Sequence, residues 1–297
     1  MICVTGAGGF VGRHLVRRLV SLGRPVRAVV RHPDEAGFPA EVEVVVADVT
    51  RPETLGRAVE GAGALVHAAA LVANRTEPYR GAYDAVNRVG TENVAAAARR
   101  AGVGRWVLLS GLGTSRGRPG SYLATRWGME EAVRRSQIPY AILQPSVCFG
   151  TGAPFVTELA RLARALPVVP AIGGGGRRFQ PIWVEDLAHC LVLCLDDDGL
   201  LGAAHPVGGA EQVTFRAIIQ AIGRAIGRRR TTVFVPVAVA RAEARLMARV
   251  LARPPLTPAA VELFTLDQTT RLDAVEHAFG FVPRGFTAHL AAHGLDG

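Results

Sequence analysis

The sequence predicts an α/β protein with a doubly wound parallel sheet and a smaller helical C-terminal lobe. Two observations lead to this fold class. Short β-branched runs alternate with longer amphipathic segments through the first half of the 297-residue chain, and these runs are too apolar to be solvated on one face, which is typical of a parallel sheet covered by helices on both sides. After Gly150 the alternation loosens into proline- and glycine-rich segments followed by further helices.

Each element follows from its local pattern of apolar residues. We expect strands at 2–5, 26–30, 42–47, 64–67, 105–110 and 140–143. We expect helices at 10–22, 52–60, 79–101, 122–136, 184–195, 214–227 and 237–252. Residues 1–150 then form the first domain and 151–297 most of the second lobe, with 184–207 returning to the sheet of the first domain.

Composition excludes several classes of protein. The 34 basic residues are all arginine and exceed the 25 acidic residues, giving a net charge of +9, but they are scattered and accompany no nucleic-acid-binding motif, so no nucleic acid is predicted as a partner. Four cysteines in apolar runs make no disulfide framework. Met1 leads directly into a strand, so we expect no signal peptide and a cytoplasmic protein. No metal site is predicted, because the histidine and cysteine pairs lie on single helix faces.

The strongest motif lies directly after the first expected strand and opens the first helix. Gly6, Gly9 and Gly12 have the spacing Gly-x-x-Gly-x-x-Gly, with Phe10 and Val11 between the last two. Backbone that approaches a pyrophosphate closely requires residues without a Cβ, and a helix N-terminus supplies free N–H donors. The motif therefore predicts a dinucleotide site; a tight turn alone is the alternative.

The residues after the next strands bear on which dinucleotide is bound. Arg31 follows the second strand and Arg13 follows the third glycine, and basic side chains there pair with a ribose 2′-phosphate, which favours NADP(H) over NAD(H). Two solvated arginines are the alternative.

Asp48 and Val49 close the third strand, where the carboxylate can accept a hydrogen bond from the adenine amino group or can instead cap the next helix. Ala68, Ala69 and Ala70 close the fourth strand with small side chains where the chain must pass near ribose and pyrophosphate.

Later motifs carry a resemblance over nearly the whole chain. They are Val86–Asn93, Tyr122–Arg126, Leu143–Val147, Leu166–Pro170, Gly173–Gly176, Arg178–Asp186 and Pro254–Thr257. With the glycine loop, these motifs resemble the extended or atypical short-chain dehydrogenase/reductases of the NAD-dependent epimerase/dehydratase superfamily. Their succession is similar to bacterial relatives of the nucleotide-binding accessory subunit of respiratory complex I. The resemblance implies a Rossmann fold, a bound dinucleotide and a C-terminal lobe that shapes the substrate site.

The resemblance also implies catalytic residues. In the superfamily a tyrosine hydroxyl exchanges the proton while hydride moves, and a cation one helical turn later holds the nicotinamide ribose. Tyr122 and Arg126 have this spacing, with arginine where the family has lysine. Either the arginine keeps the ribose contact, or catalysis has been lost. Ser110 and Thr114 are the candidates for the hydroxyl that polarises a substrate carbonyl, although Ser110 comes early at the strand end.

The family resemblance places Pro145, Ser146 and Val147 against the nicotinamide, alongside Tyr122 and Arg126. Two functions remain open. The first is an NADP(H)-dependent oxidoreductase, or an epimerase or dehydratase relative, that acts on a carbonyl or secondary alcohol of an unidentified small molecule. The second is a non-catalytic assembly or sensor protein that holds NADPH. The sequence does not assign an oligomeric state.

One further pattern bears on partners. Arg241, Arg245, Arg249 and Arg253 repeat every four residues, opposite Val239, Leu246, Met247 and Val250. Such a helix is typical of weak association with an anionic membrane surface or an acidic subunit of a respiratory complex, which would place the protein peripherally at the inner face of the membrane. The alternative is ordinary packing in the lobe with a solvated arginine face.

Overall fold

The computed structural model describes residues 1–35, 37–117, 121–251 and 254–295. By its internal contacts the chain forms two compact units. Unit 1 comprises 1–71, 77–144 and 187–205, and unit 2 comprises 72–76, 145–186 and 206–297. We propose that these units are the two domains predicted from the sequence.

Unit 1 is built on a seven-stranded sheet with the order β11-β6-β5-β4-β1-β2-β3. The strands are β1 (Ile2–Thr5), β2 (Val26–Val30), β3 (Glu43–Val46), β4 (Ala64–His67), β5 (Arg105–Leu109), β6 (Tyr140–Pro145) and β11 (Ala203–Val207), of which the last two end just outside the unit. Strand β1 pairs in parallel with both β2 and β4. Chain order reverses between β1 and β4, which is where open α/β sheets bind their ligands. The predicted doubly wound fold is confirmed.

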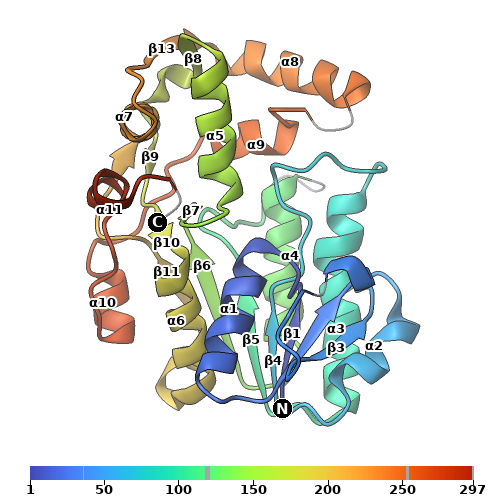
Figure 1. Ribbon diagram of the computed structural model, residues 1–297. Helices are drawn as coiled ribbons and strands as arrows, with labels where there is room; N and C mark the ends of the chain where they lie inside the picture. Colours follow the sequence, from blue (N-terminus) through green and yellow to red (C-terminus); the bar gives the residue numbers. More distant parts are fainter. Residues whose placement is uncertain (36, 118–120, 252–253, 296–297) are drawn as a thin grey trace. The chain divides into compact units, whose positions relative to one another are not determined.

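Helices cover both faces of this sheet. They are α1 (Phe10–Ser21), α2 (Pro52–Val59), α3 (Gly90–Arg100), α4 (Tyr122–Arg134) and α6 (Val184–Asp196), with short 3-10 turns η1 (Pro33–Glu35) and η4 (Asp198–Leu200). Figure 1 shows α1 on one face and α3 and α4 on the other. The helix expected at 79–101 is shorter, and it begins as a π-helix, η2 (Asp84–Val89), before continuing as α3.

A hydrophobic core of unit 1 lies between the sheet and the helices α2, α3 and α4. The strands contribute large side chains such as Leu65, Trp106 and Leu108, and the helices contribute Val94 and Met129, all fully buried. The inner strands form because their apolar runs are covered on both faces, as the sequence predicts, whereas the edge strand β3 leaves Val44 and Val46 exposed.

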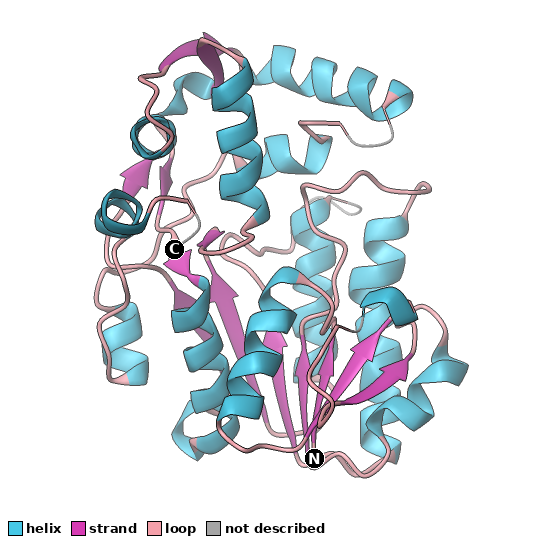
Figure 2. Ribbon diagram, in the orientation of Figure 1, coloured by secondary structure: helices cyan, strands magenta, loops and turns pink. Residues whose placement is uncertain are grey.

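Unit 2 contains helices and three two-stranded sheets in its described residues (Figure 2). The sheets pair β7 (Cys148–Phe149) with β10 (Ile182–Trp183), β9 (Arg178–Phe179) with β12 (Val213–Thr214), and β8 (Val168–Ile172) with β13 (Thr231–Val235). The helices are α5 (Pro154–Ala165), α7 (Phe215–Ala225), α8 (Val237–Val250), α9 (Pro258–Leu263), α10 (Ala274–Phe279) and α11 (Phe286–His293), with the 3-10 turn η3 (Gly173–Gly175). No helix in the described part of the chain has both the length and the hydropathy needed to cross a bilayer.

Candidate functional site

The loop between β1 and α1 follows a path that requires glycine at two positions. Gly6 has φ of 71°, and a Cβ there would lie 2.6 Å from the backbone nitrogen of Ala69. At Gly12 a Cβ would lie 2.2 Å from the carbonyl oxygen of Gly6. Both distances are far below van der Waals contact, so a side chain at Gly6 would force the loop away from the segment that follows β4, and a side chain at Gly12 would distort the loop itself.

The N-terminus of α1 is open to an anion. Its N-cap is the exposed Gly9, no side chain caps the helix, and its first turn, which includes Phe10 and Val11, has no acidic residue. The first N–H groups of a helix carry partial positive charge and need acceptors from outside the helix. A pyrophosphate fits this requirement.

The segment after β4 is fixed by Asn87, which the sequence reasoning did not single out. The Ala68 N–H donates to the carbonyl of Thr5, 3.1 Å away on the neighbouring strand, and Ala69 and Ala70 follow. The fully buried Asn87 accepts from the Leu71 N–H at 2.8 Å and donates to Thr125 of α4 at 3.2 Å. Asn87 therefore ties this segment to α4, and its only signal in the sequence is its place in the Val86–Asn93 motif.

Asp48 forms a local turn after β3. Its Oδ1 accepts hydrogen bonds from both the backbone N–H and the hydroxyl of Thr50, each at 2.8 Å. The N-cap of α2 is Arg51, so the alternative that Asp48 caps that helix is wrong. Val49 is buried and packs against Gly90 at the start of α3. The adenine contact stays a prediction.

Two arginines lie at the end of unit 1 that contains the glycine loop. Arg13, in α1, donates from Nε to the carbonyl of Gly8 at 3.0 Å, and its guanidinium lies 5.5 Å from the centre of the Phe38 ring. Arg31 directly follows β2, beside β1 in the sheet, and its side chain is exposed. Both cations thus come from elements that adjoin the glycine loop.

Tyr122 and Arg126 lie one turn apart on α4, as the spacing predicts. The N-cap Ser121 accepts from the N–H of Ala124 at 3.2 Å and so fixes where α4 begins. The Tyr122 ring packs edge-on against Tyr83, with 5.3 Å between the ring centres. The tyrosine is therefore held in a defined orientation at the first turn of the helix.

Arg126 carries a buried positive charge at the carboxyl end of β5. Its Nη2 donates to the carbonyl of Leu109 at 3.0 Å, and its Nη1 lies 3.5 Å from the sulfur of Met129. No carboxylate among the described residues lies within ion-pair distance of this guanidinium. Burial, together with the Arg126 charge, lowers the pKa of His67 to about 3, so His67 is neutral between Thr5 and Thr91.

The hydroxyl of Ser110 is bound to a carboxylate that the sequence reasoning missed. Ser110 donates to Glu130 at 2.6 Å, and Glu130, which is fully buried on α4, also accepts from Gln144 at 2.8 Å and from Arg134 at 2.7 Å. Thr114 lies 3.4 Å from the Ser110 oxygen and donates to the carbonyl of Gly111 at 2.6 Å. Both candidate hydroxyls therefore direct their protons at acceptors within the chain.

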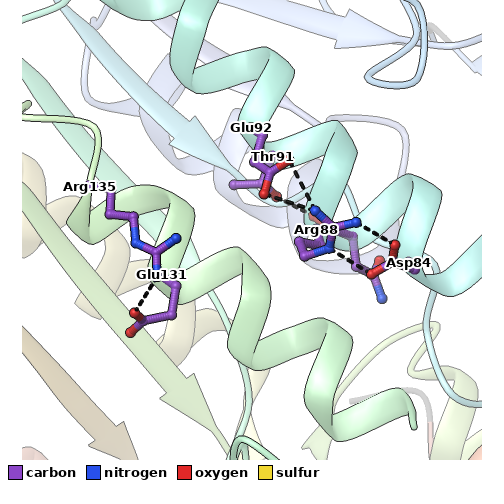
Figure 3. Close-up of polar contacts among 7 residues, drawn as sticks. Asp84, Arg88, Thr91, Glu92, Glu131 and Arg135 are labelled. Atoms are coloured by element: carbon purple, nitrogen blue, oxygen red, sulfur yellow. Dashed lines mark hydrogen bonds and ion pairs between the residues drawn. The ribbon is translucent and has the colours of Figure 1, made fainter. Parts of the chain in front are cut away.

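Helix α4 is also held from the side by η2. The stem of Arg88 fills the space beside Gly128, where a Cβ would lie 2.7 Å from Arg88 Cγ. Figure 3 shows the Arg88 guanidinium between the carboxylates of Asp84 and Glu92, at 2.6 Å and 3.0 Å. These ion pairs fix the stem in place, so Arg88 sets the distance between η2 and α4.

Pro145, Ser146 and Val147 belong to unit 2. The Ser146 hydroxyl is buried, donates to the carbonyl of Gln268 at 2.8 Å and accepts from the Gln180 N–H at 3.1 Å. The Val147 carbonyl accepts from the Ile182 N–H at 3.0 Å. Unit 1 thus brings together the glycine loop, the ends of β3 and β4, and α4, whereas the nicotinamide contact assigned to these three residues stays a prediction.

Residues 6–198 match a protein family described as NAD(P)H-binding. Among curated relatives, the ceramide reductase of Caulobacter vibrioides is 36% identical over 194 residues, which are 65% of this chain and 60% of that protein. The mitochondrial NADH dehydrogenase 1 alpha subcomplex subunit 9 of Arabidopsis thaliana is 27% identical over 220 residues, which are 71% of this chain and 54% of that protein. The matched region therefore spans little more than half the length of these two relatives.

Solved structures share the fold over the whole chain. The dTDP-glucose 4,6-dehydratase DesIV of Streptomyces venezuelae, solved with NAD and TYD bound, has a TM-score of 0.75. It is 19% identical, and the alignment covers 99% of this chain and 95% of that one. This likeness confirms the predicted fold class.

Proposed function

We propose that this chain, which belongs to the NAD(P)H-binding family, is an NADPH-dependent reductase of a carbonyl group. The observation that carries this proposal is the pair on α4: Tyr122 is held at the first turn, and Arg126 lies one turn later with its charge buried at the end of β5. A buried cation without a carboxylate requires polar ligand atoms to offset its loss of hydration.

In the proposed reaction, the cofactor, Tyr122 and Arg126 have separate roles. When bound, NADPH would supply a hydride to the carbonyl carbon, and the residues fitted to hold it are the glycine loop, the first turn of α1 and Ala68–Ala70. The Tyr122 hydroxyl would donate the proton to the carbonyl oxygen. The remaining N–H donors of Arg126 would bind the ribose hydroxyls, and its positive charge would stabilise the tyrosinate that forms.

A panel of carbonyl compounds tests this proposal. Because one relative is named a ceramide reductase, the panel should contain ceramide-type ketones in detergent beside short ketones and aldehydes, with NADPH consumption as the readout. Tyr122→Phe should reduce turnover by at least about 100-fold because the proton donor is lost, while NADPH affinity is retained. Tyr79→Phe, at an exposed position of the same unit, is the matched control. Turnover that survives Tyr122→Phe would contradict the assigned role.

The preference for NADP(H) is a separate proposal, supported by Arg13 and Arg31 at the end of unit 1 that contains the glycine loop. Titrating protein fluorescence with each nucleotide should give tighter binding of NADPH than of NADH. Arg31→Ala should reduce that margin by roughly tenfold, the value of one charge-assisted contact to phosphate. The exposed Arg57→Ala is the control. Equal affinities in the unaltered protein would overturn the preference.

A second function is a protein that holds NADPH without turning it over. The Ser110 contact with Glu130 favours it, because the hydroxyl that would polarise a substrate carbonyl donates its proton within the chain. NADPH that exchanges slowly and stays reduced with every compound of the panel would establish this function. Multiple turnovers with any compound would exclude it.

We further propose that the protein works at a membrane surface or on a respiratory complex, as its similarity to a complex I subunit suggests.

A further inference from the structure

Helix α8 exposes three of its large apolar side chains, whereas Val237 and Met247 are half-buried. Val239, Leu246 and Val250 are 45%, 62% and 73% exposed. Their spacings of seven and four residues put all three on one side of the helix, and we call this set the α8 ridge. These three side chains are therefore not packed in the lobe, whereas Met247, the fourth apolar residue of the predicted pattern, is half-buried.

The opposite side of α8 anchors the helix through small residues. Ala240 and Ala244 are buried and pack with Ile172 at the end of β8 and with Val261 of α9. Because the anchoring side chains are alanines, α8 is held with little buried area, and the apolar area of the ridge remains in water. Phe234 in β13, shortly before the helix, is also 62% exposed.

A row of arginines winds away from the α8 ridge around the helix. At 3.6 residues per turn, Arg249 lies about 80°, Arg245 about 120° and Arg241 about 160° from the centre of the ridge, so Arg249 and Arg245 are its neighbours; all three are exposed. None has an ion-pair or hydrogen-bond partner within the described part of the chain. Glu243, on the other side of the ridge, is the one acidic residue of the helix. Arg253, the fourth member of the predicted stripe, lies outside the described residues.

We infer that the α8 ridge and its arginine flank form a docking surface for an anionic lipid bilayer. Aliphatic side chains on one side of a helix enter the boundary of headgroups and acyl chains, and flanking arginines extend to the phosphates. A second copy of this chain fits less well, because a contact between two ridges would bring Arg245 and Arg249 of each copy together against only Glu243 of each. The inference is independent of the proposed reaction.

Vesicle co-sedimentation with the full chain tests the inference. The protein should bind vesicles of phosphatidylcholine mixed with phosphatidylglycerol, not vesicles of phosphatidylcholine alone, and binding should weaken from low to physiological salt. Arg245→Glu with Arg249→Glu should weaken binding at least about tenfold. The matched control is Arg99→Glu with Arg100→Glu, an exposed pair on α3 whose reversal changes the net charge equally.

The ridge itself needs a variant that leaves the net charge unchanged. Leu246→Ser with Val250→Ser should reduce binding to the mixed vesicles at least about tenfold, because two aliphatic groups no longer enter the bilayer. Thermal melting and NADPH affinity should stay as in the unaltered protein, since both positions are exposed. Binding that survives the serine variant, or that falls equally with the Arg99 and Arg100 control, would overturn the inference. So would a dimer that the serine variant converts to a monomer.

Discussion

Helices α4 and α8 have nearly equal length, and both repeat charged residues at every fourth position, yet α4 buries its charges and α8 exposes them. In α4, Arg126 and Glu130 point at the ends of β5 and β6, where Leu109, Ser110 and Gln144 supply hydrogen-bond partners. In α8, alanines face the core and the arginines face solvent. Spacing thus shows which residues share a helix face, whereas partners from elsewhere in the chain decide whether that face can be buried.

The largest expected effect is on the buried carboxylate of α4. Glu130→Ala should lower the free energy of unfolding by about 3 kcal/mol or more, because Arg134, Ser110 and Gln144 lose a shared acceptor. Glu243→Ala on α8 should change it by less than about 0.5 kcal/mol, because that side chain is exposed. Urea unfolding of the two variants measures both values. Similar losses in the two variants would remove the distinction between the helices.

The next effect tests the burial of His67, which, together with the Arg126 charge, lowers the pKa of this side chain. His67 has a folded pKa of about 3 against 6.5 for the free group, so below about pH 6.5 the unfolded chain takes up a proton that the folded chain does not. The free energy of unfolding should therefore fall by about 2 kcal/mol between about pH 7 and about pH 5 from this group alone. In His67→Gln this part of the slope should disappear, whereas the exposed His32→Gln should keep it. An unchanged slope in His67→Gln would show that His67 is protonated in the folded state.

The smallest effects lie in α8, where a change at a small buried residue should cost more stability than a change at a large exposed one. Ala244→Leu should destabilise unit 2 by about 1 kcal/mol or more, because the added atoms must displace Ile172 and Val261. Leu246→Ala removes a larger side chain, yet it should cost less than about 0.5 kcal/mol because that residue is exposed. Chemical denaturation compares the two. A greater loss from Leu246→Ala would mean that the α8 ridge is packed.

The sequence was sufficient to predict the doubly wound sheet and some of the residues of the candidate site. Strands β1, β2 and β4 have the predicted bounds because each is a short, mainly apolar run that is buried along nearly its whole length. Glu130 was missed because its partners lie 20 and 14 residues away along the chain, and only the order of the strands brings them together. The π-helix η2 before α3 was missed for a related reason. It contains Asn87, whose side chain bonds to Leu71 and to Thr125 of α4, and these partners are distant in the sequence.

Each of the two units is built from three separate segments of the chain, so neither unit is complete until late in synthesis. The last segment of unit 1, residues 187–205, is synthesised after residues 145–186 of unit 2. It contains the start of β11, the edge strand that pairs with β6. A nascent chain therefore exposes the open edge of β6 until about two thirds of the protein has left the ribosome, and an unpaired strand edge invites aggregation. Fragments cut near residue 150 would preserve the nucleotide loop but keep that edge bare. Expression of unit 1 alone thus calls for joining residues 187–207, which contain the whole of β11, to the earlier segments.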